Sequence, residues 1–148
     1  MHESQRKLTI SWKREAALVV RRSALRQPKL VYVLLCNKQL PYRRGKSRVA
    51  YIGTTRTGVF RVAGSVASKA DELLRTHGVN ELTAWVLTCR GRKRVRSWLE
   101  LERAFLYCFR QKYGELPHSN KVGGKRPGNA FNYFSRRSVE SVLDKFSS

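Results

Sequence analysis

The sequence is poor in acidic residues, and this shortage shapes the expectations about its partners. Only 10 of its 148 residues are Asp or Glu, against 31 Lys or Arg, so its formal net charge at neutral pH is +21. Such a charge repels itself in a compact fold and is tolerated where a polyanion offsets it. The shortage therefore excludes an ordinary neutral metabolic enzyme as the default and favours nucleic acid as the partner. It also makes a metal centre of several clustered carboxylates hard to assemble, although a centre with one carboxylate is not.

Cysteine is scarce as well, and long apolar runs are lacking. The three cysteines, Cys36, Cys89 and Cys108, form no C-x-x-C pair, which argues against a zinc knuckle or ribbon. We expect reduced, mostly buried thiols in a cytoplasmic protein. Residues 1–12 contain no apolar h-region, so no signal peptide is expected. No apolar run approaches the length of a membrane span, so no membrane partner is expected either.

Enough apolar residues are nevertheless present for a folded core. The hydrophobic fraction is 41%, near the globular norm, and the length suits one domain. Three apolar runs, at 29–36, 49–53 and 82–89, read as strands, the first two forming a hairpin with a long basic connection over 37–48. Helical patterns are expected at 11–26, at 58–76 after a Thr57 cap, at 95–113 before Gly114, and after a Ser135 or Ser138 cap.

One carboxylate of the longest helix lies where an apolar residue is expected. At about 100° per residue, Glu100 lies about 160° from Glu102, on the solvent side. Seven apolar or aromatic side chains of 95–113 fall within about 60° of Glu102: Val95, Trp98, Leu99, Phe105, Leu106, Phe109 and Tyr113. Burying an unpaired carboxylate costs several kcal/mol, so this position needs a reason. Glu102 could bond a buried Arg or Tyr, line a cleft, or bind a cation.

The strands and this helix resemble the GIY-YIG nuclease family. Leu30-Val31-Tyr32 keeps only the tyrosine of the first half of the signature, and Tyr51-Ile52-Gly53 keeps all of the second half. Further matches are Arg61 in the following helix, the segment 98–106 around Glu102, and the closing Pro117-His118-Ser119-Asn120. The resemblance covers about residues 28–122.

The resemblance implies a small α/β (α+β) domain with a three-stranded, mostly antiparallel sheet flanked by helices. Residues 28–122 would form this domain. Residues 1–27 would add a basic helical extension, and residues 123–148 a basic loop and a C-terminal helix packed on the same domain.

The resemblance also implies a chemistry. Glu102 would bind one Mg²⁺ or Mn²⁺ ion, and Arg61 would hold the scissile phosphate. Tyr32 and Tyr51 would place their hydroxyls at the nucleophilic water. Asn120 would tie the last loop to the catalytic face.

Two departures from the family pattern affect these expectations. Ser65 stands where the family often has His or Tyr, which leaves the base open between Tyr51 and a basic residue of 37–48 such as Lys46. The 37–48 connection is longer than in the simplest members of the family, and we interpret it as a DNA-contacting insertion. The residues expected to bind DNA are Arg43, Arg44, Lys46, Arg48, Arg92, Lys93, Arg94, Lys121, Lys125 and Arg126.

The predicted function is that of a metal-dependent endonuclease that hydrolyses phosphodiester bonds, most simply in double-stranded DNA. A restriction, mobile-element or phage nuclease would suit so small a core, with specificity supplied by insertions and by formation of a homodimer. The alternative is a non-catalytic nucleic-acid-binding protein on a degenerate nuclease fold, which Ser65 favours.

Overall fold

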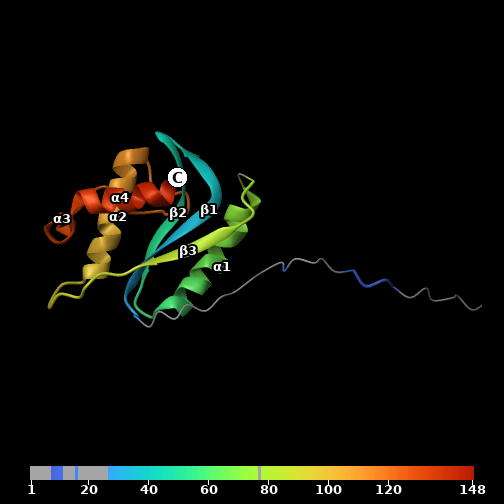
Figure 1. The fold of residues 1–148 in the computed structure, drawn as a ribbon, viewed down its shortest axis with the longest axis horizontal. Coiled ribbons are helices and arrows are strands. Elements are labelled where there is room, and N and C mark those ends of the chain that lie inside the picture. Colours follow the sequence, from blue (N-terminus) through green and yellow to red (C-terminus); the bar gives the residue numbers. More distant parts are fainter. Residues whose placement is uncertain (1–7, 12–15, 17–26, 77) are drawn as a thin grey trace, which may run out of the picture.

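A computed structural model of the chain describes residues 8–11, 16, 27–76 and 78–148. The elements (Figure 1) are β1 (Leu30–Tyr42), β2 (Gly45–Thr55), α1 (Val59–Arg75), β3 (Leu82–Leu87), α2 (Ser97–Tyr113), α3 (Ala130–Tyr133) and α4 (Arg136–Ser147). Both β2 and β3 pair antiparallel with the central β1, in the order β2-β1-β3. The predicted mixed α+β class and its three-stranded antiparallel sheet are confirmed. The predicted helix over 11–26 lies outside the described residues, apart from Ser11 and Ala16.

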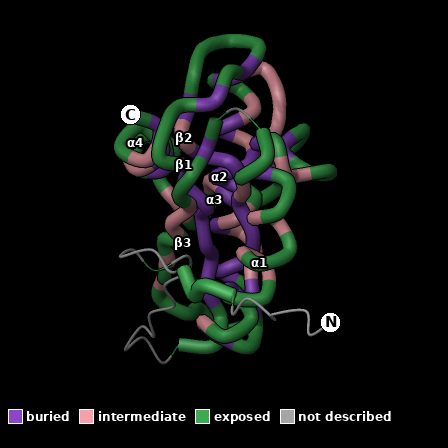
Figure 2. Tube along the Cα trace, turned by 90° about the vertical axis from the view of Figure 1, so that its right-hand side faces the viewer, coloured by how far each residue is buried: buried purple, intermediate pink, exposed green. Residues whose placement is uncertain are grey.

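The sheet separates two apolar layers (Figures 1 and 2). Because side chains alternate along a strand, Val31 and Val33 of β1 pack toward α2 and α4, whereas Tyr32 and Leu34 pack toward α1. The first layer holds most of the core, and the second is small. A site that includes Tyr32 therefore belongs to the thinner, α1 side of the sheet.

The basic connection over 37–48 is not a loop, and this prediction was wrong. Both strands continue through it, and β1 and β2 are joined by the two-residue turn Arg43-Arg44, because Tyr42 pairs with Gly45. Gly45 follows the turn with φ at 106°, which glycine adopts at little cost. The hairpin is therefore long and stiff, with irregular register near Leu35.

The hairpin extension forms because one of its faces is apolar. Leu40, Tyr42, Ser47 and Val49 are buried at alternate positions, the pattern of a strand with one covered face. The Tyr42 ring lies 5.0 Å from that of Phe109 in α2. Pro41 is tolerated because β3 pairs only with Val31–Cys36, so β1 has a neighbour on one side at this point. Polar residues at the exposed positions had hidden this pattern.

Several predicted boundaries need correction. Thr57 does not cap α1, because the N-cap residue is Gly58, with φ at 82°. The Thr57 N–H donates to Thr55 Oγ1. β3 ends at Leu87 rather than at residue 89, and α2 begins at Ser97 rather than at residue 95. Gly114 ends α2 in the left-handed conformation, as predicted. The short α3 was not predicted.

Helix α2 buries a wider face than its sequence pattern suggested. The sheet, α3 and α4 all pack on α2. The buried side chains span an arc from Ala104 through Leu101 and Phe105 to Leu106, which is centred about 60° from Glu102. Glu102 is half-buried near the edge of this arc rather than at its middle. Glu100 is not a solvated residue, since its side chain is only 18% exposed and pairs with Arg103.

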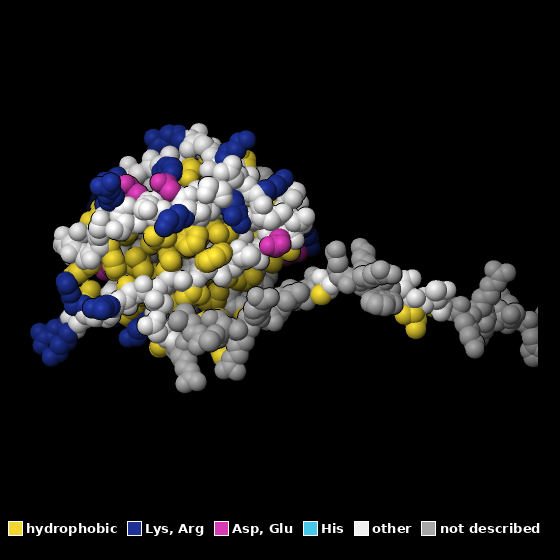
Figure 3. Space-filling view, viewed as in Figure 1, with side chains coloured by type: hydrophobic (Ala, Val, Ile, Leu, Met, Phe, Trp, Pro, Cys, Tyr) yellow, Lys and Arg dark blue, Asp and Glu magenta, His cyan; other side chains and the backbone are white. Residues whose placement is uncertain are grey.

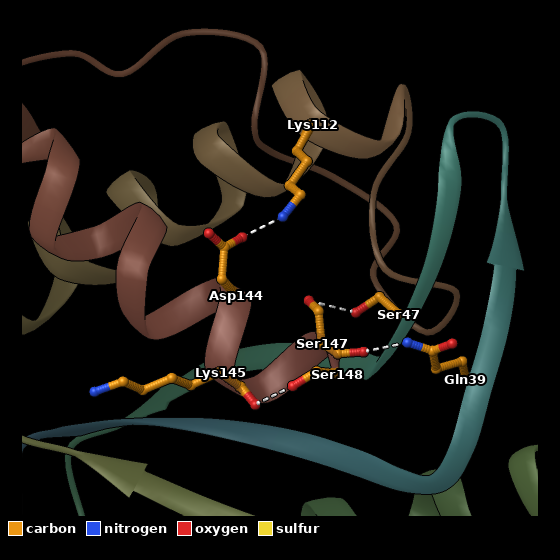
Figure 4. A network of polar contacts seen from close by, with 7 residues as sticks. All are labelled: Gln39, Ser47, Lys112, Asp144, Lys145, Ser147 and Ser148. Atoms are coloured by element: carbon orange, nitrogen blue, oxygen red, sulfur yellow. Dashed lines mark hydrogen bonds and ion pairs between the residues drawn. The ribbon is translucent and has the colours of Figure 1, made fainter.

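The last helix closes the core against the hairpin (Figure 4). Ser135 caps α4 by accepting from the Ser138 N–H, which confirms one of the two predicted caps. At its other end, Ser147 meets both strands: its Oγ accepts from Ser47 Oγ at 2.8 Å, and its carbonyl accepts from Gln39 at 3.0 Å. An ion pair between Lys112 and Asp144 joins α4 to α2. Residues 136–147 thus pack on the same domain.

The surface shows the same excess of basic over acidic side chains as the sequence. On the face shown in Figure 3, apolar side chains gather over β3 and beside α4, and Lys and Arg side chains surround them, whereas carboxylates are sparse. Trp85 of β3 is 53% exposed, and its ring lies 5.9 Å from that of Phe146 in α4. Within the described part of the chain, no helix combines the length and apolarity needed to cross a membrane.

Candidate functional site

Two of the predicted site residues, Tyr32 and Tyr51, lie together on the α1 side of the sheet. Their ring centroids are 5.7 Å apart, and Gly53, the register partner of Tyr32, lies beneath both rings. A Cβ at Gly53 would lie 2.5 Å from Tyr51 Cε1, closer than carbon atoms approach, and 3.0 Å from Tyr32 Cζ, a tight contact. The glycine of Tyr51-Ile52-Gly53 is therefore required sterically, because it leaves the space that the tyrosine pair fills.

The hydroxyl groups of the pair continue into α1. Tyr32 Oη donates to Ser65 Oγ at 2.6 Å, which brings Ser65 into the cluster. Burial raises the pKa of Tyr51. Two neighbours raise this pKa further: Tyr32, to which the Tyr51 hydroxyl donates, and the charged Glu102. Tyr51 therefore keeps its proton at neutral pH.

Glu102 reaches this cluster from the other side of the sheet. Ile52 and Thr54 lie on the α2 side of β2, and the Thr54 side chain donates a hydrogen bond to the Glu102 carboxylate. Burial raises the pKa of Glu102, and the Thr54 bond and the charge of Arg103 offset part of that rise. Among the described residues, no ion pair holds Glu102, so a bond to a buried arginine, one of the alternatives that the sequence left open, is not observed there.

Arg61 lines a hollow beside this edge of the sheet. The hollow has a volume of about 390 Å³ and is also lined by Thr54, Trp98 and Leu99. Arg61 and Thr54, the residue that bonds Glu102, therefore line the same hollow. Arg61 is exposed, and within the described part of the chain its guanidinium has no carboxylate partner. A cation in this position is available for an anionic ligand.

Asn120 performs the tie that its position predicts. Its Oδ1 accepts from the Ile52 N–H at 3.0 Å, and its Nδ2 donates to the Ile52 carbonyl at 2.8 Å. Ser119 adds a backbone bond to Ala50, so the loop covers the outer edge of β2 beside Tyr51. Both ends of the Asn120 amide are engaged with the strand, which makes it a residue that positions β2.

The basic residues of the hairpin tip are not brought to this cluster. Arg44 donates to the Gln111 carbonyl at 2.7 Å, and Arg43 pairs with Glu115 at 3.3 Å, so both fasten the turn to the end of α2. The turn lies roughly 30 Å along β1 from Tyr32. Arg48 donates to the Cys36 carbonyl at 2.8 Å, across the hairpin.

Lys46 is also too distant to act as the base. It lies five residues from Tyr51 on an extended strand, a separation of about 17 Å. The hairpin geometry therefore argues against Lys46, the residue that the sequence offered as an example of a basic alternative to Tyr51.

The remaining predicted DNA-binding residues lie on the surface. Arg92, Lys93 and Arg94 belong to a tight turn before α2, closed by pairing between Arg92 and Val95. Arg94 holds φ at 62°, a value that costs a non-glycine residue energy. The last three members of the predicted set are exposed in the loop before α3: Lys121, Lys125 and Arg126.

Sequence reasoning missed three members of the cluster. Thr54 could have been found, because alternation from Tyr51 places it on the side of β2 that faces the long helix. Arg56 lines the same hollow as Arg61, but nothing in its local pattern distinguishes it. Lys69 lies with its Nζ 4.1 Å from the centre of the Tyr51 ring, two turns after Arg61 on α1.

The residues present suit one hard cation with few protein ligands. No group of three or more His, Cys, Asp or Glu side chains that could hold a metal occurs among the described residues, so Glu102 would be the sole carboxylate. Mg²⁺ commonly binds one or two carboxylates and keeps water and substrate phosphate oxygens as its other ligands. A half-buried carboxylate with a raised pKa, held in no ion pair among the described residues, fits that description.

Comparison with known proteins identifies no relative of this chain, so a function must be argued from the residues of the site. No family model matches the chain, and no match is found among curated proteins or solved structures.

Proposed function

We propose that this protein is a metal-dependent endonuclease of the GIY-YIG type that hydrolyses phosphodiester bonds of DNA. The observation that carries the proposal is the convergence at the edge of β2: the tyrosine pair, Glu102 held by Thr54, and Arg61 in the adjoining hollow. These groups come from β1, β2, α1 and α2, and only the fold brings them together. The net charge of +21 supplies a polyanion-binding surface around them.

Each residue has a role that its environment supports. Arg61 would bind the non-bridging oxygens of the scissile phosphate and stabilise the charge that grows on them. Glu102 would hold Mg²⁺, which when bound would polarise the phosphate and lower the pKa of a coordinated water. Binding of a cation would also favour the ionised carboxylate, which burial otherwise disfavours.

The tyrosines would orient water rather than deprotonate it. The raised pKa of Tyr51 keeps its hydroxyl protonated, so it serves as a hydrogen-bond acceptor for water and not as a phenolate base. Tyr32 directs its own proton to Ser65, which leaves its lone pairs facing the cluster. In this role the pair sets the direction of attack on the phosphorus atom.

A second candidate is a nucleic-acid-binding protein without activity. Ser65, which accepts a hydrogen bond from Tyr32, and the high pKa of Tyr51 favour it, because neither supplies a strong base. On this reading the same basic surface would bind nucleic acid and leave its phosphodiester bonds intact.

One assay separates the two candidates. Purified protein is incubated with supercoiled plasmid in Mg²⁺, in Mn²⁺ and in EDTA, and the products are resolved by gel electrophoresis. The endonuclease proposal expects nicked or linear plasmid with either metal and none in EDTA. Retarded but intact plasmid under all conditions would favour the binding protein.

A further inference from the structure

A second hollow adjoins the first, on the far side of Leu99. It measures about 350 Å³ and is lined by Arg94, Val95, Arg96, Leu99, Glu100, Arg103 and Tyr133. Leu99 also lines the hollow that contains Arg61, so the two meet at that residue. A ligand held by Arg61 could therefore continue directly into the second hollow.

The charge of this second hollow suits phosphate groups. Three of its side chains are arginines and one is a glutamate, which leaves a formal charge of +2. Glu100 pairs with Arg103 at 3.2 Å, so its carboxylate is already neutralised. Within the described residues, Arg94 and Arg96 are exposed and enter no ion pair. Two guanidinium groups thus remain for an anion.

The hollow also contains an aromatic ring, which phosphate binding does not require. Tyr133 is 37% exposed, and the Arg92 guanidinium lies 5.5 Å from its ring centre. An exposed aromatic beside several arginines is the arrangement on which unpaired bases stack. A base inside a duplex has both faces covered by its neighbours and cannot stack on it.

We infer that this hollow, lined by Arg94, Arg96, Arg103 and Tyr133, binds an unpaired nucleotide of the DNA next to the phosphate held at Arg61. The inference rests on the proposed function, of which it names the preferred substrate: a duplex with a single-stranded segment at the cleavage position. Tyr133 stacks on the base, and Arg94 and Arg96 neutralise the adjoining phosphates.

The experiment measures binding in EDTA, so that cleavage plays no part. Two labelled DNA probes are compared by fluorescence anisotropy: a blunt duplex and the same duplex with a single-stranded extension. Tyr133→Ala should weaken binding of the extended probe on the order of tenfold, because one stacked base contributes about that much. Binding of the blunt duplex should change by less than about twofold, and Tyr133→Phe, which keeps the ring, should match the wild type.

A second variant, at Arg94, tests the role of the arginines without straining the fold. Arg94→Gly removes the guanidinium and relieves the backbone cost of φ at 62°. It should reduce the dependence of affinity on salt, lowering the slope of log affinity against log salt by about 0.7 to 0.9 for the extended probe. Arg137→Ala removes an exposed arginine of α4 outside both hollows and should leave the preference between the probes unchanged.

The outcomes distinguish this inference from the proposed function. Equal losses for the two probes, or no loss in Tyr133→Ala, overturn the unpaired-nucleotide site even if the wild type cleaves plasmid. A wild type that prefers the extended probe through Tyr133 but cleaves neither probe in Mg²⁺ supports the site and contradicts the endonuclease.

Discussion

The hydroxyl of Tyr32 on β1 donates to Ser65 Oγ on α1 at 2.6 Å, in the thinner of the two apolar layers. This bond fixes which way the tyrosine proton points. Because Tyr32 donates to the helix, its lone pairs remain available on the side where Tyr51 lies. Ser65, which departs from the family pattern, thereby acquires a definite role: it orients the tyrosine pair.

Ser65→Ala tests that role. The variant leaves a partly buried hydroxyl without its acceptor, which costs on the order of 1 kcal/mol and should slow cleavage about fivefold to tenfold. Ser65→Thr keeps a hydroxyl and should recover most of the rate. Ser68→Ala is the matched control, since the Ser68 hydroxyl donates to the helix backbone, at the Ser65 carbonyl. Equal rates for the two alanine variants would contradict the role of Ser65.

Gly53→Ala should damage the site while most of the core is retained. The new methyl group would collide with the rings of Tyr51 and Tyr32, so the tyrosines must move. A displacement of about 1 Å at a reacting group can cost about 10²-fold in rate. Gly64→Ala in α1 is the control, because nothing lies within 4 Å of its added Cβ, and the helix should gain about 0.5–1 kcal/mol. Cleavage rates and melting curves of both variants provide the measurement, and an active Gly53→Ala would show that the pair does not need its present packing.

Arg44→Ala should affect stability rather than DNA binding. Arg44 Nη2 donates to backbone carbonyls in the last turn of α2, at 2.7 Å to Gln111 and 3.5 Å to Arg110. Loss of these bonds should cost about 1 kcal/mol and lower the melting temperature by a few degrees. Lys46→Ala, at the exposed neighbouring position of the hairpin, should leave the melting temperature unchanged. A large loss of DNA affinity with unchanged stability in Arg44→Ala would restore the DNA-contacting interpretation.

The parts of the fold that depend on neighbouring residues could be predicted from the sequence. Apolar runs and their alternation located three strands, and Gly114 and Ser135 marked the end of α2 and the start of α4 where the structure has them. The extension of the hairpin could not be recognised in the same way, because its outward positions are polar and Pro41 interrupts the apolar pattern. What makes residues 37–48 a pair of strands is a covered face, supplied by α2 and α4 far along the chain.

The site was predictable to the extent that it follows strand and helix periodicity. The pattern singled out Glu102, but the centre of the buried face of α2 was misplaced. Leu101 and Ala104 are buried as well, and α3 and α4 also pack on α2, which periodicity within one helix cannot reveal. Thr54 and Ser65 enter the cluster through tertiary contacts. Strand alternation indicates the side of β2 on which Thr54 lies, but no local pattern reveals the hydrogen bonds that either residue makes, since their partners are distant in sequence.

Arg61→Ala should abolish most cleavage and preserve the fold. Arg61 is exposed on α1, and among the described residues its side chain has no carboxylate partner whose pairing would be lost. Removal of a preorganised cation at a developing charge costs about 10²–10³ in rate. Duplex affinity should fall little, since one cation among many is removed. A wild-type cleavage rate would place the phosphate elsewhere.

The raised pKa of Glu102 predicts a pH-dependent difference in stability between wild type and Glu102→Gln. A carboxyl whose pKa is higher in the folded state destabilises the fold when ionised. The penalty is absent below the unfolded pKa, grows as the pH rises through the window between the two pKa values, and is complete above the folded one. Without metal, Glu102→Gln should therefore melt above the wild type at neutral pH, and the two curves should converge in acid. A variant less stable at neutral pH would instead indicate a structural bond.

Metal binding adds a readout that is independent of cleavage. A cation that binds the folded state and not the unfolded chain stabilises the fold by RT ln(1 + c/Kd), where c is the free cation concentration, so the melting temperature rises with that concentration. Mg²⁺ should therefore stabilise the wild type and leave Glu102→Gln unchanged. An equal shift in both proteins would place the ion at another residue.

The most direct test of the account is the rate of Mg²⁺-dependent plasmid cleavage by Glu102→Gln, measured beside wild type and Glu72→Gln. Glu72 is an exposed carboxylate on α1, away from both hollows, so it controls for the loss of one negative charge. The account predicts that Glu102→Gln remains folded, retains DNA affinity and loses at least about 10²-fold in rate, as expected when a metal ligand is removed, whereas Glu72→Gln cleaves like the wild type. Cleavage by folded Glu102→Gln at the wild-type rate would contradict it.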